Sequence, residues 1–446
     1  MMETRLQGLT HLAFTPLSSA SLCVFRILFG LVNALGVVRF ISKGWLEELY
    51  VEPLYHFRYF GFEWVPVPSE LALKWIFAGL FVSSLGVMLG LFYRLSIVSF
   101  FVLFTWIELI DVATYLNHYY LVSLIAFLMI WMPANVRYAI VTYLPFKSHQ
   151  RTVPSICLVV LRMQVGITYV FAGIAKLNYD WLVSAQPLTI WMRRFETVPV
   201  LGGLLSEPAS AYAMSWSGAL FDLCIPFLLV SRKTRLPAFC IALVFHSLTG
   251  LLFNIGVFPI VMMVAITLFF PPEWPDTLFG RTILPDESSQ RFETSNWIVG
   301  LAGCYMLVQL LLPLRHWLYP GSSAWTEQGY RFSWNVMRIE KTGMVEFIIR
   351  DPRDGVERRV YPRDRLTTLQ VKMMATQPDL ILAYAHELAG EFARIHGVRP
   401  EVRVDSWAAL NGRRSQRFID PDVDLAAFKR GWAHKFWILP LNIGNK

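Results

Sequence analysis

Long apolar runs alternate with short polar segments through the first 314 residues of the chain. A helix needs roughly 20 apolar residues to cross the hydrocarbon layer of a bilayer. We therefore predict nine membrane-spanning helices, at residues 21–41, 71–93, 95–116, 118–134, 154–177, 211–231, 235–253, 254–270 and 296–314. The run 118–134 is short, and Asn254 and Gly256 interrupt the stretch 235–270. For that stretch, a re-entrant segment is the alternative.

After residue 314 the apolar runs stop and charged residues become frequent. The segment MVEFIIRDPRDGVERRVYP predicts two strands joined by a turn, PEVRVDSWAAL predicts a third, and residues 376–397 have apolar residues at helical spacing. The fold class that we expect is an all-α polytopic membrane bundle of about nine helices (1–314) followed by a smaller α+β extracytoplasmic domain (315–446). Because no low-complexity linker separates them, we expect the second part to dock on the first.

The composition agrees with a membrane protein, since 55% of the residues are hydrophobic, 16% are charged and the mean hydropathy is +0.45. The net charge of +8 does not indicate a nucleic-acid partner, because no basic stretch is interleaved with aromatic residues. The five cysteines lie in apolar runs without paired spacing or nearby histidine ligands. They indicate neither a disulfide framework nor a zinc site.

The basic residues between the predicted helices fall mainly on one side of the membrane. If the N-terminus is cytoplasmic, the outer loops contain only Lys43, Arg58, Arg193 and Arg194. The inner segments then contain Arg5, Arg94, Arg137, Lys147, Arg151, Arg232, Lys233, Arg235, Arg281 and Arg291. This excess predicts a cytoplasmic N-terminus. An odd number of spans then places everything after Leu314 outside the cytoplasm.

Several ionisable residues lie within the predicted spans or at their ends: Arg26, Glu108, Asp111, His118, Arg162, Lys176, Asp222 and His246. Such residues are costly in lipid and usually face a bundle interior or a water-filled cavity, so each one is a functional hypothesis. Glu108 and Asp111 are three residues apart, which predicts a shared helix face and a polar cavity. The structural alternative is that Arg26 and Arg162 pair with these carboxylates or with Asp222, and that His246 is a core histidine.

Lys176 stands where an apolar run ends, in TYVFAGIAKLNYDW at residues 168–181. One interpretation is that its long side chain snorkels to the membrane interface. The other is that it is held in a low-dielectric pocket, where desolvation favours the neutral amine. A neutral lysine is a usable general base.

Seven short motifs support the second interpretation. They are FRILFG (25–30), LGVMLGLFYRLS (85–96), LNHYYL (116–121), FAGIAKLNYDW (171–181), FNIGVF (253–258), PPEWP (271–275) and QRFIDPDVD (416–424). In this order and spacing they resemble the vitamin K-dependent γ-carboxylase family, from about residue 20 to the C-terminus. That family consists of membrane enzymes that oxidise vitamin K hydroquinone to its epoxide and carboxylate glutamate side chains of secreted polypeptides.

The resemblance implies roles for individual residues. Lys176 matches the catalytic base, which deprotonates the hydroquinone so that its alkoxide attacks dioxygen and yields a stronger base. That species removes the γ-proton of glutamate, and the carbanion takes up carbon dioxide; no metal and no biotin take part. His118 matches a histidine associated with carbanion formation. The substrate-binding residues that we expect are Asn117, Asp222, His246, Arg162 and Tyr169.

The animal enzymes of this family extend further at the C-terminus, where the additional part helps to hold the substrate's propeptide. The short C-terminal region here suggests a bacterial relative in the inner membrane, which would use vitamin K hydroquinone or a menaquinol. Its expected partners are a glutamate-containing secreted peptide, the quinone and membrane lipid.

Two alternatives follow from the same residues. The first is a quinol epoxidase that no longer carboxylates. The second is an ion- or proton-coupled transporter in which Glu108, Asp111 and Asp222 line a path, although we find no internal duplication of the kind that transporters often show.

Overall fold

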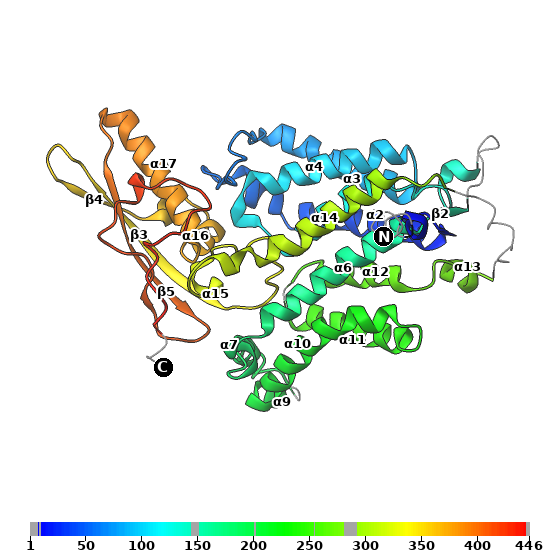
Figure 1. Cartoon of the computed structure of the whole chain (residues 1–446). Helices are drawn as coiled ribbons and strands as arrows, with labels where there is room; N and C mark the ends of the chain where they lie inside the picture. Colours follow the sequence, from blue (N-terminus) through cyan, green and yellow to red (C-terminus); the bar gives the residue numbers. More distant parts are fainter. Residues whose placement is uncertain are drawn as a thin grey trace.

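Long helices form one end of the molecule and a small sheet forms the other (Figure 1). The computed structural model describes residues 8, 10–143, 151–199, 202–253, 255–280 and 292–442. Of the residues named above, Arg5, Lys147, Asn254, Arg281 and Arg291 lie outside the described residues.

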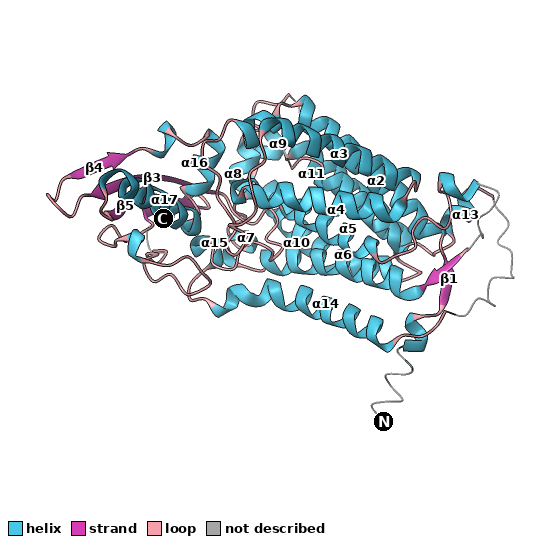
Figure 2. Ribbon diagram, turned by 90° about the horizontal axis from the view of Figure 1, so that it is seen from above, coloured by secondary structure: helices cyan, strands magenta, loops and turns pink. Residues whose placement is uncertain are grey.

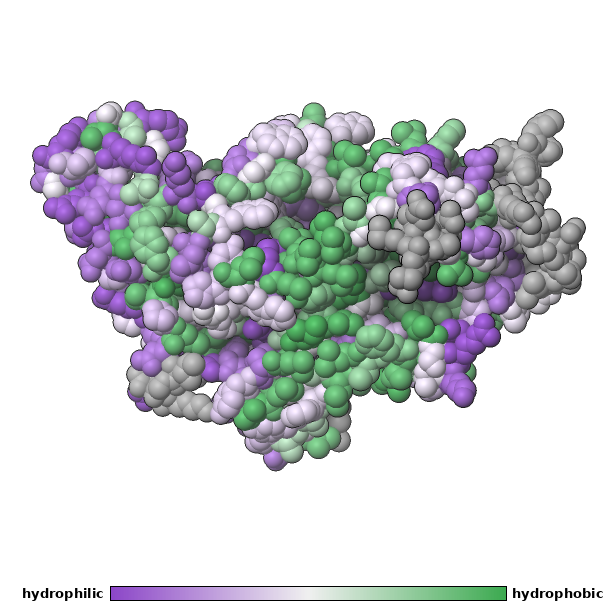
Figure 3. Space-filling model, in the orientation of Figure 1, coloured by the Kyte–Doolittle hydropathy of each residue, from purple (hydrophilic) through white to green (hydrophobic). Residues whose placement is uncertain are grey.

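Seven helices among the described residues are long and apolar enough to cross a membrane. They are α2 (Ala20–Ser42), α3 (Glu70–Leu89), α4 (Tyr93–Ile110), α6 (Ser155–Lys176), α10 (Pro208–Val230), α11 (Arg235–Leu252) and α14 (Asn296–Leu314). Their apolar side chains cover much of the surface of the bundle, whereas the sheet end is mostly hydrophilic (Figure 3). This contrast is expected if the helices contact lipid and the sheet contacts water.

The two remaining predicted spans are helical but short. They form α5 (Asn117–Ile130) and α12 (Phe258–Ile266), which continues into η4 (Thr267–Phe269). The expectation of nine full-length spans therefore holds for seven. The hydroxyl of Tyr93, at the start of α4, donates to the Met129 carbonyl near the end of α5 at 2.7 Å. Because α5 has 14 residues and α4 has 18, α5 is about 6 Å shorter than α4.

Shorter elements connect the long helices. At the end of the bundle far from the sheet, β1 (Pro16–Ser18) and β2 (Thr152–Pro154) pair as an antiparallel ribbon. The other short helices are η1 (Glu47–Val51), η2 (Val112–Thr114), η3 (Ile140–Tyr143), α7 (Tyr179–Leu182), α8 (Leu188–Arg193), α9 (Gly202–Ser206), α13 (Trp274–Leu278), η6 (Arg315–Leu318), α15 (Ser323–Thr326), η7 (Pro362–Asp364) and η8 (Leu425–Ala427).

Close packing of α2 on α3 depends on Gly30 and Arg26. A Cβ at Gly30 would lie 2.4 Å from the backbone nitrogen of Met88, so only glycine permits this approach. One turn earlier, the buried guanidinium of Arg26 donates to the carbonyls of Val87 (2.6 Å), Met88 (2.7 Å) and Tyr138 (2.8 Å). The expectation that Arg26 pairs with a carboxylate is wrong, because its partners are backbone carbonyls, two of them at the end of α3.

The C-terminal part is built on a four-stranded antiparallel sheet with the order β4-β3-β5-β6. The strands are β3 (Lys341–Arg350), β4 (Glu357–Val360), β5 (Glu401–Leu410) and β6 (Gln416–Arg417), and the helices packed with them are α16 (Thr368–Met374) and α17 (Pro378–His396). Burial alternates along β5, as expected for a strand with one face on a core. The predicted strands and the predicted helix at 376–397 are confirmed.

Buried polar contacts join the C-terminal part to the bundle, as expected from the absence of a linker. The Asp111 carboxylate, directly after α4, accepts from Gln370 Nε2 at 2.8 Å and lies 3.3 Å from His56 Nδ1. At a second point, Asp180 of α7 accepts from Arg413 (2.5 and 2.7 Å) and from Asn411 Nδ2 (2.8 Å). The two parts therefore form one interlocked structure.

We expect Gly30→Ala to destabilise the bundle by about 1–3 kcal/mol, because overpacking forces α2 away from α3. Gly36→Ala is the matched control on the same helix, since a Cβ there meets nothing within 4 Å. Thermal unfolding of the two variants in detergent measures the difference. Equal melting temperatures for both variants would contradict the close approach.

We expect Asp180→Asn to weaken docking of the C-terminal part by about 1–3 kcal/mol, because it removes a charged acceptor. Burial acts to raise the pKa of Asp180, but Arg413 and Asn411 outweigh it and leave that pKa below its usual value. The contribution is therefore present above about pH 4 and is lost as the pH falls through the lowered pKa. Hydrogen exchange across residues 178–182 reports the change; Arg414→Ala is the control.

Candidate functional site

Helix α6 holds Lys176 and Tyr169, seven residues apart and so on the same face. Lys176 is the last residue of the helix, and its side chain is 7% exposed. Its Nζ donates to Asp222 Oδ2 at 2.7 Å and to the Ala172 carbonyl at 3.2 Å, and it lies 5.4 Å from the ring centre of Trp181. The amine therefore points into the protein, and the snorkelling alternative is wrong.

Contact between α6 and α10 brings the two members of this ion pair together. A Cβ at Gly173 would lie 2.7 Å from Leu223 Cγ and 2.9 Å from its backbone nitrogen. Glycine at this position lets α10 approach α6 one turn before Lys176 and beside Asp222. The Lys176–Asp222 pair is thus a direct consequence of a backbone contact.

A second polar pair lies on the same side of α6. The Tyr169 hydroxyl and His246 Nε2, from α11, are 2.6 Å apart, and the Asp222 carboxylate is close enough to Tyr169 to interact electrostatically. His246 Nδ1 is buried and has no hydrogen-bond partner among the described residues. His246 is therefore only half satisfied, unlike an ordinary core histidine, which leaves one ring nitrogen available to another group.

The ring of Phe258 lies between His118 and His246. The His118 ring lies in the first turn of α5, 5.8 Å from the Phe258 ring, which is in turn 6.3 Å from the His246 ring. A Cβ at Gly256, whose φ is +64°, would lie 4.0 Å from His118 Nε2 and 3.9 Å from an Arg39 nitrogen. We call Lys176, Asp222, Tyr169 and His246 the Lys176 group. The first turns of the two short helices, α5 and α12, therefore meet beside it.

Two predicted site residues lie elsewhere. Asn117 accepts from the Tyr115 hydroxyl at 3.0 Å and donates to the Asn335 carbonyl at 3.3 Å, so it contacts the C-terminal part. Arg162 donates to the carbonyls of Leu268 (2.6 Å) and Phe270 (3.0 Å) at the end of α12 and η4. Since Arg162 is 14 residues before Lys176, the two are about 21 Å apart along α6. In the described part of the chain Arg162 pairs with no carboxylate, and the structure separates it from the Lys176 group.

The carboxylates of Glu108 and Asp111 also diverge. Helix α4 ends at Ile110, and Asp111 is extended, with φ −142° and ψ 120°. The predicted shared helix face is therefore wrong, because the backbone turns between the two residues. Asp111 faces the C-terminal part, whereas Glu108 lines a cavity.

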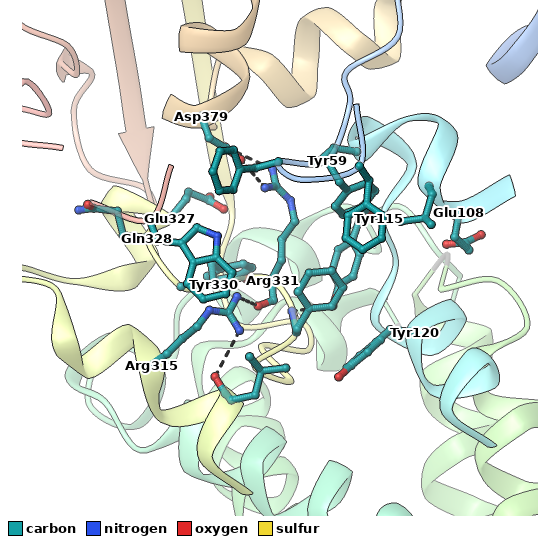
Figure 4. Close-up of a pocket in the computed structure, with 18 of the residues that line it drawn as sticks. Tyr59, Glu108, Tyr115, Tyr120, Arg315, Glu327, Gln328, Tyr330, Arg331 and Asp379 are labelled. Carbon is teal, nitrogen blue, oxygen red and sulfur yellow. Dashed lines mark hydrogen bonds and ion pairs between the residues drawn. The ribbon is translucent and has the colours of Figure 1, made fainter. Parts of the chain in front are cut away.

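This inter-domain cavity has a volume of about 570 Å³ and lies between the bundle and the C-terminal part. Aromatic side chains, among them Tyr59, Tyr115 and Tyr120, separate its charged mouth from Glu108 in α4 (Figure 4). The cationic side chains that line it are Arg58, Arg315, Arg331, Arg430 and Lys435. The sequence shows no pattern that would have grouped them, because they come from four separate segments.

Some charges at the mouth are already paired. Arg331 lies 2.5 Å from Asp379, and Arg430 lies 3.3 Å from Glu63. Arg58, Arg315 and Lys435 have no carboxylate within ion-pair distance among the described residues. The mouth therefore carries an excess of positive charge.

A further ion pair is buried beside the mouth. Glu327 lies 3.5 Å from Lys341. Burial lowers the pKa of Lys341 to about 8, although Glu327 acts in the opposite direction, and burial raises the pKa of Glu327. Desolvation thus works against both charged forms at this pair.

A smaller cavity of about 60 Å³ continues from Glu108 toward Arg39, Tyr119 and Val257. Glu108 lines both cavities, so it stands between the mouth and the first turn of α5. None of the seven predicted site residues lines either cavity. Within the described part of the chain, no group of three or more His, Cys, Asp or Glu side chains is placed to hold a metal ion.

Two known families match parts of the chain. The HTTM domain family matches residues 14–274, which include α2 to α12. The lumenal domain of vitamin K-dependent gamma-carboxylase matches residues 294–443. The chain belongs to the vitamin K-dependent gamma-carboxylase family. No solved structure matches the chain.

For this gamma-carboxylase family member, the lumenal match identifies the side of the membrane on which the sheet lies. The protein is an integral membrane protein with an extracytoplasmic C-terminal part. Lys176 and His118 lie at the ends of α6 and α5 that face this part. Both cavities lie at the same end of the bundle. The ionisable groups and the charged mouth are therefore on the extracytoplasmic side.

We expect Asp222→Ala to lower the free energy of unfolding by about 3–5 kcal/mol, because it leaves the Lys176 charge buried without a partner. The double variant Lys176→Met/Asp222→Leu should regain most of this loss, since apolar groups of similar volume replace the pair. Thermal unfolding of the single and double variants measures the coupling.

The control is the exposed pair Lys74–Glu70, whose side chains are 52% and 54% exposed. Its removal should cost less than about 1 kcal/mol. A double variant no more stable than Asp222→Ala would contradict a buried ion pair between Lys176 and Asp222.

Proposed function

We propose that this protein is a vitamin K-dependent γ-glutamyl carboxylase. It couples oxidation of vitamin K hydroquinone, or of a menaquinol, by dioxygen to the addition of carbon dioxide to a peptide glutamate. The observation that supports this most is the buried Lys176 amine, bound to Asp222 at the extracytoplasmic end of a family-type bundle.

Lys176 acts as the general base toward the hydroquinone. It must be neutral to accept a proton, and the short contact with Asp222 offers a route to that state. Transfer of one proton from Nζ to Oδ2 gives an amine and a carboxylic acid, which avoids burying two charges. Asp222 therefore aligns the Lys176 amine and provides an acceptor for its proton inside the bundle.

His118, Tyr169 and His246 bound the space next to this base. Tyr169 fixes the His246 ring through Nε2, so that its unpaired Nδ1 is available to a bound substrate. His118 faces the same Phe258 ring and is the candidate for assisting proton removal from glutamate. Asn117 is a positioning residue, because it ties the start of α5 to the Asn335 carbonyl.

The cationic mouth of the inter-domain cavity receives the peptide. A polypeptide that carries several glutamates is anionic. Arg58, Arg315 and Lys435, which pair with no carboxylate of the described residues, provide positive charge where it would arrive from the extracytoplasmic side. Such complementarity accelerates encounter and orients the partner. We place the N-terminus in the cytoplasm of a bacterium and the bundle, residues 1–314, in its inner membrane.

The positions of Glu108, Asp111 and Asp222 do not support the transporter alternative. Its three carboxylates occupy separate environments, since Asp222 pairs with Lys176, Asp111 binds the C-terminal part and Glu108 lines the cavities. A continuous ion path needs these groups to follow one another along a single channel.

The test is one reaction that contains the purified protein, reduced vitamin K, oxygen, labelled bicarbonate and a short glutamate-containing peptide. We expect epoxide and fixed label from the unmodified protein. Lys176→Ala should reduce both products by at least about 10²-fold, the contribution of a general base. Lys74→Ala, on the exposed surface, is the control.

Epoxide without label in the unmodified protein would favour the epoxidase that has lost carboxylation. Unchanged epoxide formation by correctly folded Lys176→Ala would refute the assignment of this lysine as the base.

A further inference from the structure

Large aromatic side chains are exposed in three segments where the bundle meets the C-terminal part. We call these residues the aromatic rim. They are between 41% and 74% exposed, and they are Phe60, Phe62, Trp64, Trp317, Trp432 and Phe436. Apolar side chains that gather on one exposed surface mark a contact with a partner or with a membrane.

Hydrogen bonds and an ion pair hold the three segments of the rim together. The Tyr319 hydroxyl donates to the Trp432 carbonyl at 2.7 Å. Arg430 donates to the Arg58 carbonyl at 2.6 Å and lies 3.3 Å from Glu63. The rim is thus one continuous surface, although its segments are far apart in the sequence.

Two of the three segments adjoin membrane-spanning helices. Helix α14 runs along one side of the bundle toward the C-terminal part (Figure 2), and Trp317 follows soon after its end at Leu314. The loop that contains Trp64 is fixed to the extracytoplasmic end of α4, because Trp106 Nε1 donates to the Pro66 carbonyl at 3.2 Å. The rim therefore lies at the level where these two spans leave the hydrocarbon layer.

The third segment belongs to the C-terminal part and reaches the same level through the bond between Tyr319 and Trp432. The rim also continues the exposed apolar surface of the spans, to which Val102 of α4 and Leu311 of α14 belong. Tryptophan is enriched at membrane–water interfaces, since its ring contacts acyl chains while its N–H stays among polar groups. The partner that fits both the position and the composition of the rim is lipid.

We propose that the aromatic rim is a membrane-docking surface, whose partner is the phospholipid headgroup layer of the extracytoplasmic leaflet. Trp432 and Phe436 then anchor the C-terminal part on the bilayer itself, in addition to its contacts with the bundle. Phe60, Phe62 and Trp432 also line the inter-domain cavity, so its mouth opens beside the headgroups. This inference goes beyond the proposed function and does not depend on it.

The test is photocrosslinking of the full-length protein in phosphatidylcholine nanodiscs. The photoreactive residue p-benzoylphenylalanine replaces one rim residue at a time, at Trp64, Trp432 or Phe436. After irradiation, mass spectrometry identifies what has been attached to each variant. We expect all three variants to gain the mass of one phospholipid, because the reactive ketone attacks only groups that it contacts.

Two further positions calibrate the yield. Val102, on the membrane-spanning surface of α4, should give the phospholipid adduct. Ile395 is 68% exposed and lies in α17, which leads away from the bundle (Figure 1). It is about 24 Å farther along this helix than Asp379, which pairs with Arg331 at the mouth, so it should give no adduct. Because the replaced side chains are all exposed, each variant should unfold at the temperature of the unmodified protein.

The alternative outcomes would each overturn the inference. One is adduct formation at Val102 with none at Trp432 and Phe436. Another is adduct formation at Trp64 alone among the rim positions, because the bundle would then contact lipid where the C-terminal part does not. Crosslinks at Trp432 that join two copies of the chain would show instead that the rim is an interface between protein molecules.

Discussion

A lysine amine buried in an apolar bundle must have a partner, and this requirement organises the structure around Lys176. The partner, Asp222, is on another helix, so α6 and α10 have to touch at this depth. Gly173 makes that possible, since any side chain there would collide with Leu223. The pair in turn places Tyr169 and His246 beside it, and Phe258 connects this group to His118.

The extracytoplasmic end owes its shape to short helices and to docking. Helix α5 is about 6 Å shorter than α4, and the C-terminal part contacts this end of the bundle at Asn117 and Asp111. Asp111 and Asp180 hold that part in place through Gln370, Arg413 and Asn411. The same docking closes the inter-domain cavity, so the interface that stabilises the fold also creates the mouth.

The buried arginines show how a bundle can hold charge without carboxylates. Arg26 and Arg162 both bind backbone carbonyls where helices end. A guanidinium has five donors, which allows it to satisfy several carbonyls at once. The carboxylates have other contacts: Asp222 pairs with Lys176, Asp111 binds the C-terminal part and Glu108 lines the cavity.

The sequence by itself determined the helices, the strands of the C-terminal part and the candidate base. A long apolar segment in lipid can satisfy its backbone only as a helix, and alternating burial requires a strand, so local pattern is sufficient for these elements. Only the tertiary structure decided the partners of the charged residues, because Lys176 and Asp222 are 46 residues apart and no periodicity relates them. It also separated Glu108 from Asp111, because α4 ends at Ile110 and the extended Asp111 binds Gln370 of the C-terminal part. The sequence also did not predict the charged mouth of the cavity, because its charges come from distant segments that meet only when the two parts dock.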